Sequence, residues 1–268
     1  MLICQLTDLH VRLRGIAANR VSETNMFTER AFKAVAGLTP TPDLILLTGD
    51  LTESGKPAEY QNLVAILRRT LHRKLYAIPG NHDNRETMRA ELAGWPGIVA
   101  HADYIQYAIE DYPVRVIMLD TLVEGFSYGE LGADRLAWLE ETLGAQPERP
   151  TLIAMHHPPF VTAIPHMDRI ALRDADAFTA LVARHRQVQR IICGHHHRPI
   201  FGTCAHAVVS ISPSIAHQVV WTLDAEDEGA LNFEPPAFHL HLWQPSHGIV
   251  SHTLYVDSFP GPFPFLSA

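Results

Sequence analysis

Seven residues of types that bind metal ions stand at five places along the chain, each after a short apolar stretch. They are Asp8 and His10, Asp50, Asn81, His156, and His195 with His197. Carboxylate, amide and imidazole donors without a thiolate suit Mn, Fe, Co or Zn better than Cu(I), and the set is too rich in nitrogen for Ca²⁺. Seven ligands exceed the need of one ion, whereas two ions that share a carboxylate would use them all. Such a pair, about 3.5–4 Å apart, clamps the attacking and leaving oxygens of a phosphoryl transfer, and a water between two cations has a lowered pKa and becomes the nucleophile.

Each fragment alone has an ordinary structural explanation. The Asp-x-His fragment can be a capping carboxylate beside a surface histidine, Gly49-Asp50 can be a turn, and His156-His157 before two prolines can simply end a strand. The Gly-Asn-His-Asp sequence at residues 80–83 is more specific. The fragments gain weight because they occur together in this order, each after an apolar run.

Short aliphatic and β-branched runs predict buried strands that would position these residues. They cover residues 2–6, 44–48, 75–78, 116–119, 152–155 and 191–193, and helical spacing of apolar residues predicts helices over residues 29–38, 57–71 and 136–143. This alternation predicts an α/β fold with parallel strands. The carboxyl ends of such strands form one rim, so the seven residues should meet there. Glycine before Asp50, Asn81 and His195 would allow sharp turns and close approach.

The chain after about residue 205 is expected to form strands without helices. Residues 238–243 alternate between apolar residues and His or Trp, residues 246–248 suit a turn, and a second strand runs to about residue 256. We expect His239, His241 and His252 to lie on alternating faces of this edge hairpin and to face solvent or an interface. Neither a linker nor a repeat interrupts the chain, which predicts one domain over residues 1–268.

The hairpin and tail, residues 237–268, are more apolar than a free surface end should be. An exposed patch here would mark an interface, and the prolines of the tail hold it extended, which suits docking on a second subunit. We therefore expect a homodimer or a higher homo-oligomer; the alternative is that the tail folds back onto its own sheet. The residues of the expected patch are Phe238, Leu240, Leu242, Phe259, Phe263 and Phe265.

The amino-acid composition limits which classes of partner and which cell compartment we expect. The 268 residues carry 21 Lys and Arg against 29 Asp and Glu, a net charge of −8, so we expect neither a nucleic-acid polymer nor a membrane surface as partner. No apolar run approaches the roughly 18 residues of a membrane span. Three scattered cysteines, and an N-terminus without a basic segment or a small-residue cleavage site, favour the cytoplasm.

The order of the motifs resembles the calcineurin-like metallophosphoesterase superfamily. It runs Asp8-x-His10, Gly49-Asp50, Gly80-Asn81-His82-Asp83, His156 and Gly194-His195-x-His197. Met-His-His-Pro-Pro at residues 155–159 and Ala-His-Gln at residues 216–218 look like the bacterial branch that contains glycerophosphodiesterases and class III cyclic-nucleotide phosphodiesterases. The resemblance covers about residues 1–225. It implies a four-layer α/β/β/α sandwich with the metal site at the carboxyl ends of the strands, often in dimers or larger assemblies.

The resemblance also assigns the metal ligands. It implies one ion held by Asp8, His10, Asp50 and His197, and a second held by Asp50, Asn81, His156 and His195, with Asp50 bridging the two. One residue departs from the pattern: His196 stands where the family frequently has Asn, which leaves open what accepts its side chain.

Residues beside the ligands are expected to act on the substrate. By resemblance Asn81 and His82 contact the phosphate, and His82 as an imidazolium could donate to an oxyanion or a leaving oxygen. Asp83 could orient the His82 ring or cap the helix that follows. A phosphate contact is also implied for His217, against the alternative of a satisfied core histidine, and His157 either supports the site or is exposed.

Specificity is expected to reside in three loops, residues 11–22, 121–130 and 160–172. Arg12, Arg14 and Arg20 in the first of these either meet the substrate or lie in solvent.

The leading functional hypothesis is a two-metal phosphodiesterase for small diesters such as glycerophosphodiesters or cyclic nucleotides, with Asp50 and His82 as its catalytic residues. A phosphomonoesterase or a nucleotide pyrophosphatase could use the same centre. A non-catalytic scaffold is a third hypothesis, because this fold also occurs in binding roles, but the intact set of ligands argues against it.

Overall fold

The computed structural model describes residues 1–265, which contain two main sheets and six helices. The first sheet has the order β13 (Gly248–Tyr255), β12 (Ala237–Gln244), β1 (Leu2–Leu6), β2 (Leu44–Thr48) and β3 (Tyr76–Ile78). The second has the order β4 (Tyr107–Ile109), β5 (Arg115–Met118), β6 (Thr151–Ala154), β7 (Val188–Cys193), β9 (Ala207–Ile211) and β8 (Ile200–Cys204). Strands β10 (Gln218–Val219) and β11 (Leu231–Asn232) pair to form a small two-stranded sheet. The helices are α1 (Thr24–Ala36), α2 (Pro57–Thr70), α3 (Arg85–Glu91), α4 (Gly132–Gly144), α5 (Pro165–Asp168) and α6 (Ala175–Arg184).

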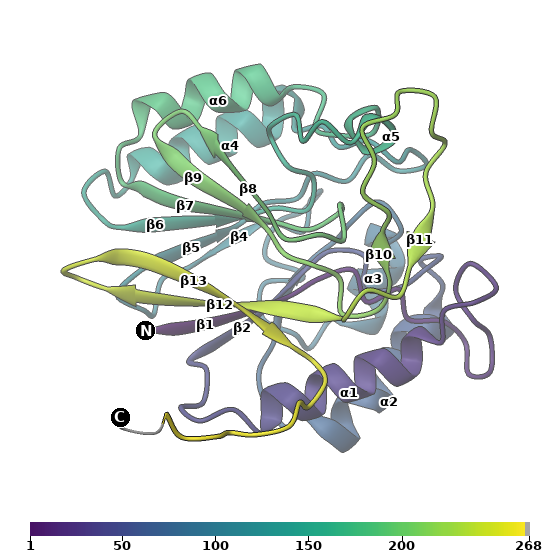
Figure 1. Ribbon diagram of the computed structural model, residues 1–268. Coiled ribbons are helices and arrows are strands. Elements are labelled where there is room, and N and C mark those ends of the chain that lie inside the picture. Colours follow the sequence, from purple (N-terminus) through teal and green to yellow (C-terminus); the bar gives the residue numbers. More distant parts are fainter. Residues whose placement is uncertain (266–268) are drawn as a thin grey trace.

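The two sheets stack face to face, and each is covered on its outer side by helices. Figure 1 shows α1 and α2 beneath the first sheet and α4 and α6 above the second. Strands β1, β2 and β3 run parallel to one another, as do β5, β6, β7 and β9. This arrangement confirms the four-layer α/β/β/α fold expected from the sequence.

Buried apolar side chains form two clusters, one on each side of the second sheet. The larger joins the first sheet to α1 and α2 and includes Phe32, Leu46 and Tyr60. The smaller lies under α4 and α6 and includes Leu139 and Phe178. Burial of this apolar surface stabilises the two sheets against each other.

The predicted elements are present with shifted ends. The largest differences are at α1, which covers Thr24–Ala36 where residues 29–38 were expected, and at α4, which begins four residues before the predicted helix. Thr24 and Thr28 occupy the buried face at the start of α1, and these polar residues concealed the start of the helix in the hydrophobic pattern.

The C-terminal hairpin differs from its prediction in the position of β12. This strand pairs with both β1 and β13, so only β13 lies at the edge. His239 and His241 are fully buried rather than facing solvent or an interface, whereas His252 on β13 is exposed. The alternation of apolar and polar residues suggested that one face of the strand is exposed to solvent. The second sheet instead covers the histidine face of β12, where His239 stacks on Phe201.

The expected apolar patch is therefore smaller than predicted. Phe238 and Leu240 are buried in the larger core cluster, and Leu242 is half-buried. Phe259, Phe263 and Phe265 in the tail are exposed. The last three residues of the 237–268 segment lie outside the described residues.

Within residues 1–265, no helix has the length and apolar character needed to cross a membrane.

Candidate metal centre

All seven residues singled out by the sequence come together where five strands end. Asp8 and His10 follow β1, Asp50 follows β2, and Asn81 follows β3; His156 follows β6, and His195 and His197 follow β7. The ligand atoms of Asp8, His10, Asp50 and His197 all lie within 4.8 Å of one another, as do those of His156, His157 and His195. Six of the seven are buried, and the seventh, Asn81, is half-buried with its Oδ1 3.2 Å from His156 Nε2.

Asp50 lies between the two groups. Its Oδ2 atom is 3.7 Å from His10 Nε2 in one group and 3.4 Å from His156 Nε2 in the other. A single carboxylate oxygen that faces both groups is the geometry required of a ligand shared by two ions.

Hydrogen bonds fix which nitrogen of each imidazole faces inward. The Nδ1–H groups of His10, His156 and His197 donate to Glu53 Oε2, Thr48 O and His217 O at 2.8, 2.8 and 2.9 Å. His195 is reversed, because its Nε2–H donates to Ile170 O at 3.0 Å. The other nitrogen of each ring faces the cluster, and in the neutral imidazole it is an electron-pair donor, as in histidines that bind metals.

The donor set fits metal ions. His10 Nε2 and His197 Nε2 lie 3.1 Å apart, and both rings already carry their proton on Nδ1. When both rings are neutral, two lone pairs face each other without a proton between them, and a cation in this place would turn their repulsion into ligation. The carboxylate and amide oxygens of Asp8, Asp50 and Asn81 complete a set suited to borderline divalent or trivalent ions.

The charges of the cluster also favour bound cations. Burial opposes the charged forms, but His156 and neighbouring imidazoles outweigh it and hold the pKa of Asp50 well below its usual range. Burial likewise lowers the pKa of His156, but the Asp50 carboxylate outweighs this and raises that pKa to about 9. The buried carboxylates therefore attract positive charge to the site, whether protons or metal ions.

The backbone is unusual at the same residues. Asp8, His10, Asp50, His195 and His197 have φ values of 54°, 47°, 49°, 71° and 53°, in the left-handed region that residues other than glycine seldom adopt. Neighbouring glycines give the rings room: a Cβ atom at Gly49 would collide with the His156 ring, and one at Gly194 with the Thr7 hydroxyl. The close approach predicted for these glycines is present, but the left-handed ligands had no signal in the sequence.

His82 and His217 lie beside the cluster. The His82 ring centroid is 4.7 Å from that of His10, and the His217 centroid is 4.9 Å from that of His197. His82 N–H donates to Asp50 Oδ1 at 2.9 Å, and its Nδ1–H donates to Glu53 O at 2.9 Å, so Nε2 is left for another partner. Burial lowers the pKa of His82, but Asp50 and the Glu53 carbonyl together outweigh it and raise this pKa.

A cavity of about 380 Å³ opens beside His82. One group of its lining residues includes Asn81 and His82, and a second group includes Glu124, Phe126 and Ser127. The second group belongs to the 121–130 loop that we expected to govern specificity. Its volume lies in the range of small-molecule sites, and it adjoins the cluster through Asn81 and His82.

Asp83 has neither of its predicted roles. Its carboxylate accepts hydrogen bonds from the backbone N–H groups of Leu51 and Gly80 and from the Tyr60 hydroxyl at 2.8–3.0 Å. Asn84, not Asp83, caps α3 by accepting from Thr87 N–H. Asp83 therefore ties the loop after β2 to the loop after β3.

The remaining histidines and arginines divide between support and surface. His157 is buried, donates to Ser127 O at 3.2 Å and accepts from the Thr121 hydroxyl at 2.8 Å, so it supports the loop of residues 121–130. His196 is buried, and neither ring nitrogen has a hydrogen-bond partner among the described residues. Arg12 Nε lies 3.6 Å from a Glu59 carboxylate oxygen, and two further arginines, Arg14 and Arg20, are exposed.

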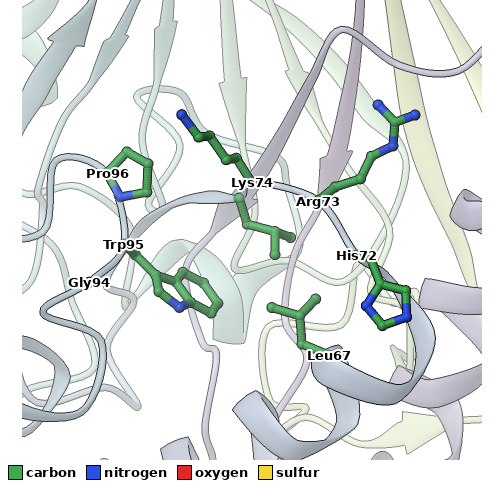
Figure 2. Close-up of a pocket in the computed structure, with 8 residues that line it drawn as sticks. Leu67, His72, Arg73, Lys74, Gly94, Trp95 and Pro96 are labelled. Carbon is green, nitrogen blue, oxygen red and sulfur yellow. The ribbon is translucent and has the colours of Figure 1, made fainter.

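A second cavity of about 380 Å³ lies at the opposite end of β3. Figure 2 shows Leu67, Lys74 and Trp95 around it. Residues 72–75 line this cavity and precede β3, whereas Asn81 follows β3, so the cavity is separated from the cluster by the length of the strand. Cavity volume alone does not distinguish the two places; only the first adjoins groups able to bind and polarise a substrate.

Two stacked sheets whose strand ends gather carboxylate, amide and imidazole side chains define a metal-dependent phosphoesterase. Residues 1–199 match the family model described as calcineurin-like phosphoesterase, and the chain belongs to this family. A protein of Arcobacter nitrofigilis named "Probable glycerophosphodiester phosphodiesterase GpdQ" is 34% identical over 266 residues, which cover 99% of this chain and 97% of the relative. A 3′,5′-cyclic-nucleotide phosphodiesterase of Nostoc is 34% identical over 245 residues, covering 89% and 86%.

Solved structures agree with the fold. A dimetal phosphatase from Danio rerio superposes with a TM-score of 0.63 at 15% identity, covering 96% of this chain and 99% of that one. A purple acid phosphatase from yellow lupin gives a TM-score of 0.60 at 12% identity, covering 100% and 57%. The comparisons thus confirm the family, the fold and the enzyme class, a phosphodiesterase, that the motifs predicted.

Proposed function

We propose that this protein hydrolyses small phosphodiesters, such as glycerophosphodiesters or cyclic nucleotides, at a centre of two metal ions. The observation that carries the proposal is the Asp50 carboxylate, one oxygen of which faces both groups of donors. The full-length relatives named as glycerophosphodiester and cyclic-nucleotide phosphodiesterases support this choice of substrates.

The residues divide into two ligand sets that share Asp50. Asp8, His10 and His197 would hold one ion with it, and Asn81, His156 and His195 the other. Two such ions, of Mn, Fe, Zn or Co, supply charge neutralisation at the phosphoryl oxygens and lower the pKa of water.

The protein itself orients the substrate and moves protons. His82 is held by Asp50 and by the Glu53 carbonyl with Nε2 free, so it donates from Nε2 to a phosphoryl or leaving oxygen. Asn81 and His217 contact the phosphate beside it, and the cavity beyond His82 receives the alcohol.

A substrate comparison tests the proposal against its nearest alternative. We expect the metal-loaded enzyme to hydrolyse bis-p-nitrophenyl phosphate with a higher kcat/KM than mono-p-nitrophenyl phosphate, and to act on a glycerophosphodiester or a cyclic nucleotide. A preference for the monoester would indicate a phosphomonoesterase, and cleavage confined to nucleotide anhydrides would indicate a pyrophosphatase.

We further propose a cytoplasmic homodimer or higher homo-oligomer in which the tail docks on a neighbouring subunit. Phe259 and Phe263 remain 60% and 79% exposed on a single chain, and exposed apolar patches mark interfaces. Deletion of residues 258–268 should shift the mass measured by light scattering towards the monomer while metal content stays unchanged. A full-length protein that is monomeric at micromolar concentration would contradict this proposal.

A further inference from the structure

Glu53 lies where the metal donors meet the substrate-binding side of the site. Its Oε2 accepts the Nδ1–H of His10 at 2.8 Å, and its backbone carbonyl accepts the Nδ1–H of His82 at 2.9 Å. The side chain is only 11% exposed. One residue thus contacts a candidate ligand through its carboxylate and the candidate acid through its main chain.

The backbone around Glu53 is fixed relative to His10. Glu53 N–H donates to Val11 O at 3.1 Å, and His10 N–H donates to Asp50 O at 2.9 Å. Val11 and Thr52 form a parallel bridge between the two segments. Residues 50–53 therefore run alongside residues 10–11, and a shift of one segment would displace the other.

We propose that Glu53 is a positioning residue that sets the orientation and tautomer of both His10 and His82. This inference rests on the proposed function. A neutral imidazole carries its proton on either nitrogen, and a hydrogen bond at one nitrogen decides which. The carboxylate holds the proton of His10 on Nδ1, so Nε2 faces the other donors, and a carboxylate partner also makes the ligating nitrogen more basic. The carbonyl fixes His82 in the same way, with Nε2 towards the substrate.

Two substitutions separate the charge of the carboxylate from its shape. Glu53→Ala removes the partner of His10, whereas Glu53→Gln is isosteric, can still accept the Nδ1–H, and carries no charge. Glu29→Gln is the matched control, because Glu29 pairs with Lys33 and Arg69 on the surface of α1 and α2, away from the centre.

The first readout needs no activity. Nitrogen-15 NMR of the metal-free protein at pH 8 reports the tautomer of His10 directly. We expect the Nδ1–H form alone in the wild type and in Glu29→Gln, and a mixture of both tautomers in Glu53→Ala. Equilibrium dialysis against Mn²⁺ or Zn²⁺ should give an affinity about 10- to 100-fold weaker in Glu53→Ala, the usual effect of losing such a partner, with Glu53→Gln in between.

Kinetics at saturating metal test the contact with His82. With both ions bound, kcat of Glu53→Ala should still be lower, by about 10-fold, because the segment that holds His82 loses its side-chain contact with His10 while its backbone contacts remain, whereas KM changes less. Partial rescue by Glu53→Gln is expected.

Wild-type tautomer and metal affinity in Glu53→Ala would overturn the proposal. A loss of one bound ion per chain at saturation, equal in both variants, would also overturn it and make Glu53 a ligand. If Glu53→Ala does not fold, Glu53→Gln decides by the same readouts. Should the wild type hydrolyse no diester, the proposed function fails, but the tautomer and the affinity still test the role of Glu53.

Discussion

Buried histidines occur in two regions of this molecule and are held in different ways. At the metal centre, His10, His156 and His197 each donate one N–H to a protein oxygen and turn the other nitrogen to their neighbours. Between the two sheets, His239 is equally buried but has no hydrogen-bond partner for either nitrogen among residues 1–265. His241, buried beside it, uses both nitrogens, which pair with Ser251 Oγ and Gln5 Oε1. A ring with one nitrogen bonded to the protein and the other left free, more than a buried ring, therefore distinguishes the candidate ligands from histidines enclosed by the fold.

The largest effect on metal content and activity should come from substitution of Asp50. This residue belongs to the metal centre, whereas His239 belongs to the region between the sheets. Asp50→Ala removes the carboxylate that faces both groups of donors, so we expect loss of both ions and of all measurable activity. Inductively coupled plasma mass spectrometry measures the number of metal ions per chain, and steady-state kinetics measure the activity.

Its control is His239→Phe, which should keep both ions and full activity. Two ions retained by Asp50→Ala, or metal lost from His239→Phe, would contradict the distinction.

The second-largest effect is on kcat. It tests whether, within the metal centre, residues that act on the substrate can be distinguished from metal ligands. His82→Ala should lower kcat by about 10²- to 10⁴-fold, the range for loss of acid–base assistance, with metal content almost unchanged. A variant that purifies without metal would show that His82 is a ligand or a structural support.

The smallest effect is on the free energy of unfolding and comes from His239, which lies between the two sheets. His239 is desolvated and lies near Arg190, and together these lower its pKa to about 4. An unfolded histidine takes up its proton near pH 6.5, so the unfolded state binds more protons between about pH 6.5 and 4. The free energy of unfolding should therefore fall as the pH is lowered through this window.

Replacement of His239 by Phe should remove that dependence. The phenyl ring can keep the stacking on Phe201, whose centroid is 5.9 Å away. We expect a gain of about 1 kcal/mol at pH 7.5, from removal of an unpartnered polar group, and about 2 kcal/mol more at pH 5. Urea unfolding at the two pH values measures both. His252→Phe on the exposed strand β13 is the control, and an equal gain there would argue against the explanation.

The sequence was sufficient to predict where the donors meet, because strand ends and glycines are local signals. Asp50 and His195 each follow an apolar run and a glycine, and parallel strands bring such positions to one rim. The sequence could not predict the face of His239, because β12 pairs with β1 across more than two hundred residues and its covering sheet is not encoded locally. Glu53 was missed because an acidic residue three positions after Asp50 looks like any loop carboxylate until the fold brings it to His10.

The left-handed backbone at the donor residues affects which amino-acid substitutions would stabilise this fold. Each non-glycine residue in that region costs about 1–2 kcal/mol, and five such residues together cost on the order of the whole net stability of a domain. The backbone at these residues thus opposes folding, and bound ions would offset that cost. In a lineage that no longer needed catalysis, glycine at any of these positions would relieve this backbone cost. Thermostability screens that ignore activity should therefore select against the centre first, so stabilising variants of this protein are best sought with bound metal as part of the selection.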